Sequence, residues 1–202
     1  MNKLLLILIL TLSFHSWAKA DDISDFQIEE MSVGDSLLDY FTETEIIENN
    51  IDKGKQRKFH RVLILSEKDD RYTSIVKKLE LYYGMHIYIN PKDNYYKIYG
   101  LEGMLDFKSN FSQCISKKSE IENELVKLFN DSKKINKKTI HPADATNKSI
   151  VYETFIKVDL KSKFYELRLQ CFDWSKKMGH MDHFRIAILS DDVNEDINNL
   201  YK

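Results

Sequence analysis

The chain has 202 residues with 30 basic and 32 acidic side chains, which is enough length for one domain with its own hydrophobic core. The formal net charge of −2 argues against a nucleic-acid partner, because proteins that bind phosphate backbones present an excess of Lys and Arg. The sequence contains no Walker loop, nucleophile elbow, dinucleotide fingerprint or His-Glu-x-x-His pair. Common motifs therefore indicate neither an enzyme nor a cofactor.

The first twenty residues have the pattern of a cleavable signal peptide. An apolar run from Leu4 to Phe14 is shorter than the roughly 20 residues that span a bilayer. It is followed by Ala-Lys-Ala at positions 18–20, with small residues where a signal peptidase accepts them. We therefore predict cleavage after Ala20 and a single α+β domain over residues 21–202, periplasmic or secreted, without a transmembrane segment. An uncleaved N-terminal anchor is the alternative.

Charge is distributed unevenly along the predicted mature chain. Residues 21–50 carry ten acidic side chains and no Lys or Arg, whereas basic residues cluster at 53–61 and again at 133–138. A bipolar surface that docks a partner or anionic lipid is one interpretation. Charge runs more often mark solvated turns and helix faces, and we favour that interpretation here.

The first half of the mature chain shows helix signals followed by strand signals. We predict a short helical hairpin over residues 32–50, whose second helix begins at a capping box of Thr42 and Glu45. Residues 59–65 favour a strand, and residues 85–89 and 95–101 are typical of a β-hairpin. The pattern over residues 70–82 is ambiguous between helix and strand.

The second half begins with the best helix signal, over residues 111–130, where Cys114, Ile121, Leu125 and Leu128 share one stripe. Residues 131–149 lack an apolar period and are predicted to form a long polar loop. A second hairpin is predicted over residues 156–171, then a strand over 183–189 and a short C-terminal helix from Asp191 or Asp192 to near Leu200.

This order of elements predicts an α+β fold. We expect an antiparallel sheet built from hairpins, with a short N-terminal helical hairpin, one long middle helix and a short C-terminal helix, all helices packing on one face.

Cys114 and Cys171 are the only cysteines. The first lies on the apolar stripe of the predicted helix and the second on the apolar face of a predicted strand, so both point into the same interface. In an oxidising compartment we predict that they form a structural disulfide. A redox-active pair is the alternative, but such thiols are usually close in sequence.

The segment His180-Met-Asp182-His183 is the one candidate metal site in the sequence. Two imidazoles and a carboxylate at this spacing could hold zinc or copper, with His86 or His141 arriving from elsewhere in the fold. Two nearby histidines are more often plain turn residues. Seven tyrosines between residues 72 and 99 could similarly line a groove, although cross-strand packing is the preferred interpretation.

The stretch DDISDFQIEEMSVGDSLLDYF, from Asp21 to Phe41, resembles the start of the mature chain in a family of small exported bacterial proteins. The segments YYKIYGLEG at 95–103 and CFDW at 171–174 are also similar to that family. The resemblance implies export but no activity. We therefore predict a non-catalytic periplasmic binding or protein-interaction module. The alternatives are an envelope enzyme of hydrolase type with an unrecognised site and a periplasmic metal-binding protein.

Overall fold

A computed structural model describes residue 23 and residues 26–66, 76–77, 79–107, 110–129, 132–160 and 163–199, with residues 76–77 described by their backbone. Ten strands and three α-helices are assigned within these ranges. In chain order the elements are β1 (Gln27–Ile28), β2 (Met31–Ser32), the 3-10 turn η2 (Leu37–Asp39), α1 (Glu43–Glu48), β3 (His60–Ser66), β4 (Val76–Lys77), β5 (Gly84–Ile89), β6 (Ile98–Asp106), α2 (Phe111–Leu128), β7 (Lys133–Ile140), β8 (Ile150–Leu160), β9 (Lys163–Asp173), the 3-10 turn η3 (Lys176–Met178), β10 (His183–Ser190) and α3 (Asp191–Asn199).

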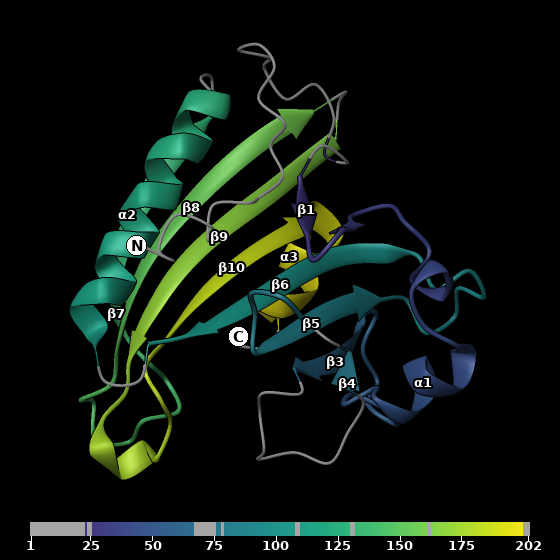
Figure 1. The fold of residues 1–202 in the computed structure, drawn as a ribbon, viewed down its shortest axis with the longest axis horizontal. Coiled ribbons are helices and arrows are strands. Elements are labelled where there is room, and N and C mark those ends of the chain that lie inside the picture. Colours follow the sequence, from purple (N-terminus) through teal and green to yellow (C-terminus); the bar gives the residue numbers. More distant parts are fainter. Residues whose placement is uncertain are drawn as a thin grey trace, which may run out of the picture.

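One eight-stranded sheet organises the molecule. Its strand order is β4-β3-β5-β6-β10-β9-β8-β7, and every pairing is antiparallel except that of β3 with the two-residue β4. A separate two-stranded sheet pairs β1 with β2. The long strands β8, β9 and β10 lie side by side and bend strongly, so the sheet is twisted and curved rather than flat (Figure 1).

The predicted hairpins are present. β8 and β9 pair from Leu160 opposite Lys163 to Ile150 opposite Asp173 without a register shift, and β5 pairs with β6. In the first of these hairpins the odd-numbered residues of β9 from Tyr165 to Cys171 are buried, as the alternating pattern predicts. The strand at residues 183–189 and the C-terminal helix also lie where they were predicted.

The main hydrophobic core lies on one face of the sheet. There α2 buries Cys114, Ile121 and Leu125 against the apolar faces of β9 and β10, which confirms the predicted stripe. At the other end of the sheet the same core includes Leu37 and Ile46 from the N-terminal segment. Both halves of the core therefore share one sheet face.

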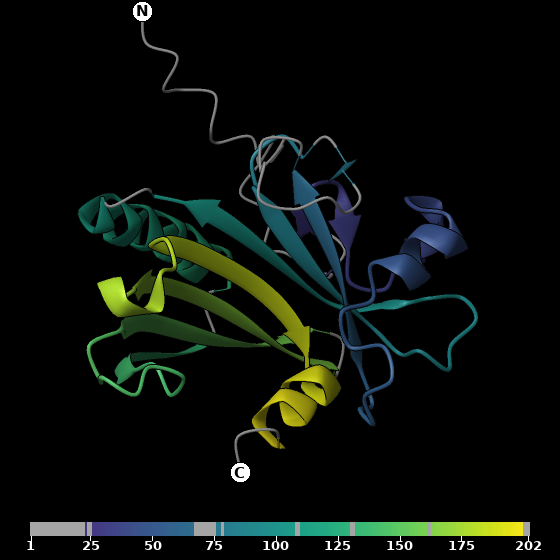
Figure 2. The ribbon, with the colours of Figure 1, turned by 90° about the horizontal axis from the view of Figure 1, so that it is seen from below.

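The C-terminal helix α3 lies on the opposite face. Its Asn194 contacts Arg168 of β9, whereas Cys171, three residues further along the same strand, faces α2. Because side chains alternate along a strand, residues three apart point to opposite sides. Val193 joins a smaller apolar cluster with Ala187 and Leu189 on this second face. Figure 2 shows α2 and α3 at separate sides of the molecule. The prediction that all helices pack on one face is therefore wrong.

The predicted N-terminal helical hairpin is also wrong, and with it the predicted architecture. Residues 32–50 form a single 3-10 turn and the six-residue α1 instead of two helices. The capping box itself is present, since Thr42 and Glu45 cap each other. Ile46 is the only buried residue of α1, so the segment lacks the apolar stripe that a second packed helix needs.

The long polar loop predicted over residues 131–149 is wrong for its first half. Residues 133–140 form β7, which pairs with β8 along eight residues at the edge of the sheet. Seven of these eight residues are exposed, so the strand carries no buried apolar period that a sequence pattern could reveal. The predicted signal peptide lies outside the described residues and stays a prediction.

Candidate functional site

A groove of about 580 Å³ lies over the second face of the sheet, the face that α3 only partly covers. Side chains from β3, β5, β6, β10, β9, β8 and β7 line it, so its floor crosses almost the whole sheet. Basic residues outnumber acidic ones in the lining, with Arg57, Arg61, Lys137, Lys157, Arg168 and Arg185 against Glu102, Glu153 and Glu166.

The carboxylate of Glu102 on β6 is the buried centre of this groove. Its Oε1 lies 2.9 Å from Arg185 Nε and 3.0 Å from His86 Nδ1, and its Oε2 accepts a hydrogen bond from the Tyr88 hydroxyl at 3.2 Å. Burial alone would raise the pKa of Glu102, but the Arg185 charge and the His86 and Tyr88 contacts outweigh it and hold that pKa well below its usual range. Glu102 is therefore a fixed anion that holds its neighbours in place.

Arg185 on β10 is the lining cation that pairs with Glu102. Its Nε lies 2.9 Å from a Glu102 carboxylate oxygen in an ion pair without hydrogen-bond geometry. The guanidinium carbon lies 4.7 Å from the centre of the Phe172 ring. Both terminal nitrogens are without a protein hydrogen-bond partner among the described residues, and the side chain is 26% exposed. These nitrogens are therefore available to a ligand.

Two further cations rest on a second ring in the floor. Lys137 Nζ lies 5.2 Å from the centre of the Phe155 ring, and the Arg168 guanidinium lies 5.6 Å from the same centre. Arg168 Nε also pairs with Glu166 at 2.6 Å, whereas Lys137 has no carboxylate partner in the described part of the chain. Contacts of this kind hold a charged group beside apolar surface.

The walls of the groove are held by two buried aspartates. Asp52 is fully buried and pairs with Arg61 at 2.8 Å and with Arg57 at 3.3 Å, which fixes both arginines at the β3 side. At the β7 side, Asp144 organises the loop over residues 141–149 by accepting hydrogen bonds from Ser149 and other hydroxyl and backbone groups. These hydrogen bonds hold the pKa of Asp144 well below its usual range.

The predicted metal residues are not brought together as a metal site. His180 is exposed and meets the Trp174 ring edge-on at 4.7 Å, while the Asp182 carboxylate accepts a hydrogen bond from the Trp174 backbone N–H. His183 is buried and stacks on Phe172 at 4.5 Å. Within the described residues no three His, Cys, Asp or Glu side chains are grouped to hold a metal ion.

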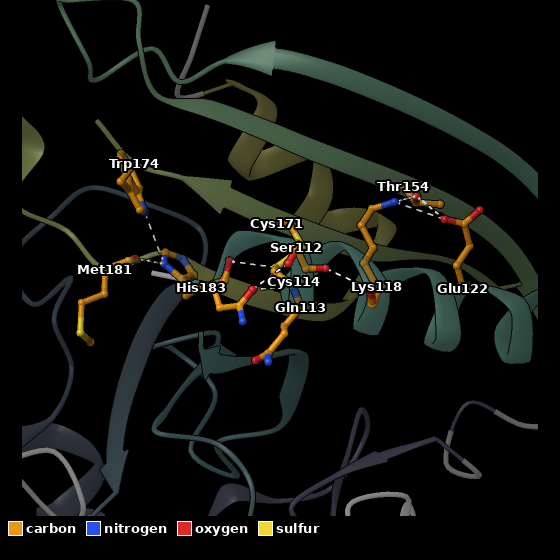
Figure 3. The surroundings of a disulfide bond; sticks show 12 residues. Ser112, Gln113, Cys114, Lys118, Glu122, Thr154, Cys171, Trp174, Met181 and His183 are labelled. Atoms are coloured by element: carbon orange, nitrogen blue, oxygen red, sulfur yellow. Dashed lines mark hydrogen bonds and ion pairs between the residues drawn. A yellow bond between two sulfur atoms is a disulfide. The ribbon is translucent and has the colours of Figure 1, made fainter. Parts of the chain in front are cut away.

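The additional histidines considered for that site lie apart from each other. His141 does approach the segment, since its ring lies 4.5 Å from Trp174, but His86 pairs with Glu102 instead. The turn between β9 and β10 is thus an aromatic and imidazole cluster. Figure 3 shows Trp174 and Met181 beside His183.

A disulfide joins Cys114 of α2 to Cys171 of β9, the pair that the sequence predicts. On the same helix face lies Lys118, a buried lysine that donates to the Thr154 hydroxyl and pairs with Glu122 at 3.2 Å (Figure 3). Thr154 is fully buried, so this network ties α2 to β8 and does not open to the groove. The disulfide and the network together fix α2 on the sheet.

The tyrosines of residues 72–99 do not gather in one groove, and Tyr72 lies outside the described residues. Only Tyr88 lines the groove, Tyr99 packs against Phe59, and Tyr95 is 79% exposed. Burial and the neighbouring Glu102 raise the pKa of Tyr88 far above its usual value. Packing on the sheet is therefore their main role, as preferred from the sequence.

Most of the groove was missed by sequence reasoning. Arg168, Gln170 and Phe172 lie on the polar face of β9, which the alternating pattern assigns to solvent. One signal was present, because a phenylalanine at 155 and another at 172 interrupt the polar faces of β8 and β9. Aromatic rings among charges on the outer face of a hairpin indicate a covered or ligand-binding face.

In the described part of the chain no helix combines the length and apolar character needed to cross a membrane. Comparison with protein families, with characterised proteins and with solved structures finds no match to this chain. The function is therefore inferred from the groove and its contacts.

Proposed function

We propose that the protein is a non-catalytic binding module that works outside the cytoplasm and holds an anionic ligand in the groove over the second sheet face. The single observation that carries the proposal is Arg185. Arg185 lines the groove beside the Phe172 ring and a fixed Glu102, and its two terminal nitrogens have no hydrogen-bond partner among the described residues. A ligand with a carboxylate or sulfonate group and an apolar part would match both features.

The pairing pattern of the lining favours binding over hydrolysis. Two imidazoles line the groove: His86 pairs with Glu102, and His141 Nδ1 accepts a hydrogen bond from the Ala143 backbone N–H. Apart from the buried Tyr88, the hydroxyl in the lining is that of Thr139. Thr139 lies on β7, five strand spacings or roughly 24 Å from His86 on β5, and its hydroxyl donates to Glu153 rather than to His141. A base must lie within hydrogen-bond reach of the nucleophile that it activates. This arrangement supports a binding role.

The export part of the proposal rests on the predicted signal peptide and on the disulfide. Disulfides persist in oxidising compartments and are rare in the cytoplasm. Secretion of the full chain in a bacterial host, followed by N-terminal sequencing of the periplasmic product, tests it. We expect a mature chain that begins at Asp21. Retention of the full chain in the cytoplasm would contradict it.

The ligand proposal is tested with a defined anionic aromatic probe, 8-anilinonaphthalene-1-sulfonate, titrated by fluorescence into the folded full-length protein. We expect Arg185→Gln to weaken probe binding roughly tenfold, because a charge-assisted contact is lost. Lys137→Gln should weaken it by a smaller factor. Lys92→Gln, an exposed lysine in the turn between β5 and β6, is the matched control and should bind normally.

Arg185→Gln removes a positive charge that balances the buried Glu102 carboxylate, which can destabilise the fold. The thermal unfolding of this variant is therefore measured together with its probe affinity. Lys137 has no described carboxylate partner, so Lys137→Gln tests the groove without leaving a buried carboxylate unpaired. Equal affinity of both groove variants and the Lys92→Gln control would overturn the ligand proposal.

A further inference from the structure

The outer edge of β7 is a strand edge with which no other described segment pairs. β7 ends the sheet, and its eight residues keep unbroken register with β8, from Lys133 opposite Lys157 to Ile140 opposite Ile150. In an antiparallel pair alternate residues direct their N–H and C=O groups away from the partner strand. Such groups therefore face outward along roughly 26 Å of regular backbone.

Four lysines give this edge a strong positive charge on both faces of the sheet. Lys133 and Lys137 lie on the groove face, and Lys134 and Lys138 lie on the face toward α2. Lys134 pairs with Glu122 at 2.8 Å, and none of the other three has a carboxylate partner among the described residues. Lys137 and Lys138 lie over the rings of Phe155 and Tyr152, so three ammonium groups have no described carboxylate partner and can pair with a partner's acids.

Lysines on an edge strand also prevent edge-to-edge aggregation, and that role fits here as well. Two copies of β7 paired through this edge would bring lysines close to lysines, and like charges in that arrangement are destabilising. The same charges favour a strand that carries Asp or Glu. An edge that only needed protection could be short or bulged, whereas β7 is long and regular.

We propose that β7 binds an extended acidic segment of another protein, which adds to the sheet as a further strand. The backbone groups of β7 supply affinity, and its lysines select acidic side chains at alternate positions. The exposed Ile140, at 53% exposure, gives the end of the strand an apolar contact. β7 contributes Lys137 to the groove, but Arg185 lies three strand positions away on β10 and the outward backbone edge of β7 is not part of the groove lining, so either proposal can fail without the other.

The test adds an end-blocked eight-residue peptide of alternating Glu and Val to the full-length protein. We follow the exchange of backbone amide hydrogens by NMR. The expected result is that outward amides within residues 133–140 exchange at least about tenfold more slowly with saturating peptide, while other surface amides do not change. Binding without this protection would place the peptide elsewhere and overturn the proposal.

Charge selection is tested with two double variants. Lys133→Glu with Lys138→Glu should weaken peptide binding about tenfold or more, because two attractions become repulsions. Lys53→Glu with Lys92→Glu makes the same change in net charge at exposed sites away from β7 and should leave binding unchanged. Equal binding of an alternating Lys and Val peptide, or self-association through residues 133–140 without peptide, would contradict the proposal. Arg185→Gln should leave peptide binding intact.

Discussion

At the scale of single residues, His183 is the side chain with the clearest link between structure and pH. It is buried, its Nδ1 lies 3.0 Å from the Met181 carbonyl oxygen and 3.3 Å from Trp174 Nε1, and its Nε2 has no described partner. Burial and the nearby Arg185 lower the pKa of His183 to about 4. The folded protein therefore holds this imidazole neutral at pH values where an unfolded chain protonates it.

This difference predicts a loss of stability in mild acid. Between about pH 6.5 and pH 4 the unfolded state binds the proton and the folded state does not, so the free energy of unfolding falls as the pH falls. The loss from this one group reaches roughly 3 kcal/mol at pH 4 and levels off below it. Urea unfolding of the wild type and His183→Phe at pH 7, 5.5 and 4.5 measures it.

His183→Phe keeps an aromatic ring against Phe172 and should lose this part of the pH dependence. His180→Gln changes an exposed histidine of the same turn and serves as the matched control, which should keep the wild-type slope. A slope that is equal in His183→Phe and the wild type would show that His183 does not carry the effect.

Asp52 is the residue whose removal should cost the most stability through charge. Its carboxylate is fully buried and serves Lys55, Arg57 and Arg61 together. Asp52→Asn keeps the shape but leaves Arg61 without its carboxylate partner and Arg57 with only the more distant Asp196, so we expect a loss of roughly 3 kcal/mol in the free energy of unfolding. Asp159→Asn, at an exposed acid of β8, should change it by less than about 0.5 kcal/mol. Similar losses in the two variants would refute this role of Asp52.

At the scale of elements, the sequence predicted those helices and strands whose buried apolar residues recur at a regular spacing. The apolar stripe placed α2 within two residues of its observed bounds, and the alternating pattern found the β8–β9 hairpin but began β8 six residues late. β7 has no buried face, and it forms a strand because it pairs with the edge of β8. The sequence of residues 133–140 alone does not reveal this pairing. The N-terminal segment has a true capping box, but a cap starts a helix and does not extend it when only Ile46 is buried.

At the scale of the whole molecule, the groove could not be predicted because it depends on strand order. Arg185, Glu102 and His86 lie on β10, β6 and β5, and they meet only because β10 inserts between β6 and β9. Nothing local in the sequence of β10 fixes that insertion. The disulfide was predictable for the opposite reason, since two apolar faces and two cysteines leave a single pairing.

The link between Cys114 and Cys171 holds α2 on the sheet across 57 residues of chain, a span that includes β7 and β8. Closing a loop of this length removes conformational freedom from the unfolded state, which the chain-entropy model values at about 4 kcal/mol. We expect Cys114→Ser with Cys171→Ser to lower the free energy of unfolding by that order, measured by urea unfolding without reductant.

Dithiothreitol should destabilise the wild type toward the same value and leave the double variant unchanged. The groove lies on the other side of the sheet from α2, so the folded double variant should still bind the anionic probe with wild-type affinity. Loss of probe binding in the folded double variant would mean that the link to α2 also sets the shape of the floor. Preserved binding would show that the disulfide contributes to stability and not to binding. Recognition of the probe would then depend on Arg185, Lys137 and the rings of Phe172 and Phe155.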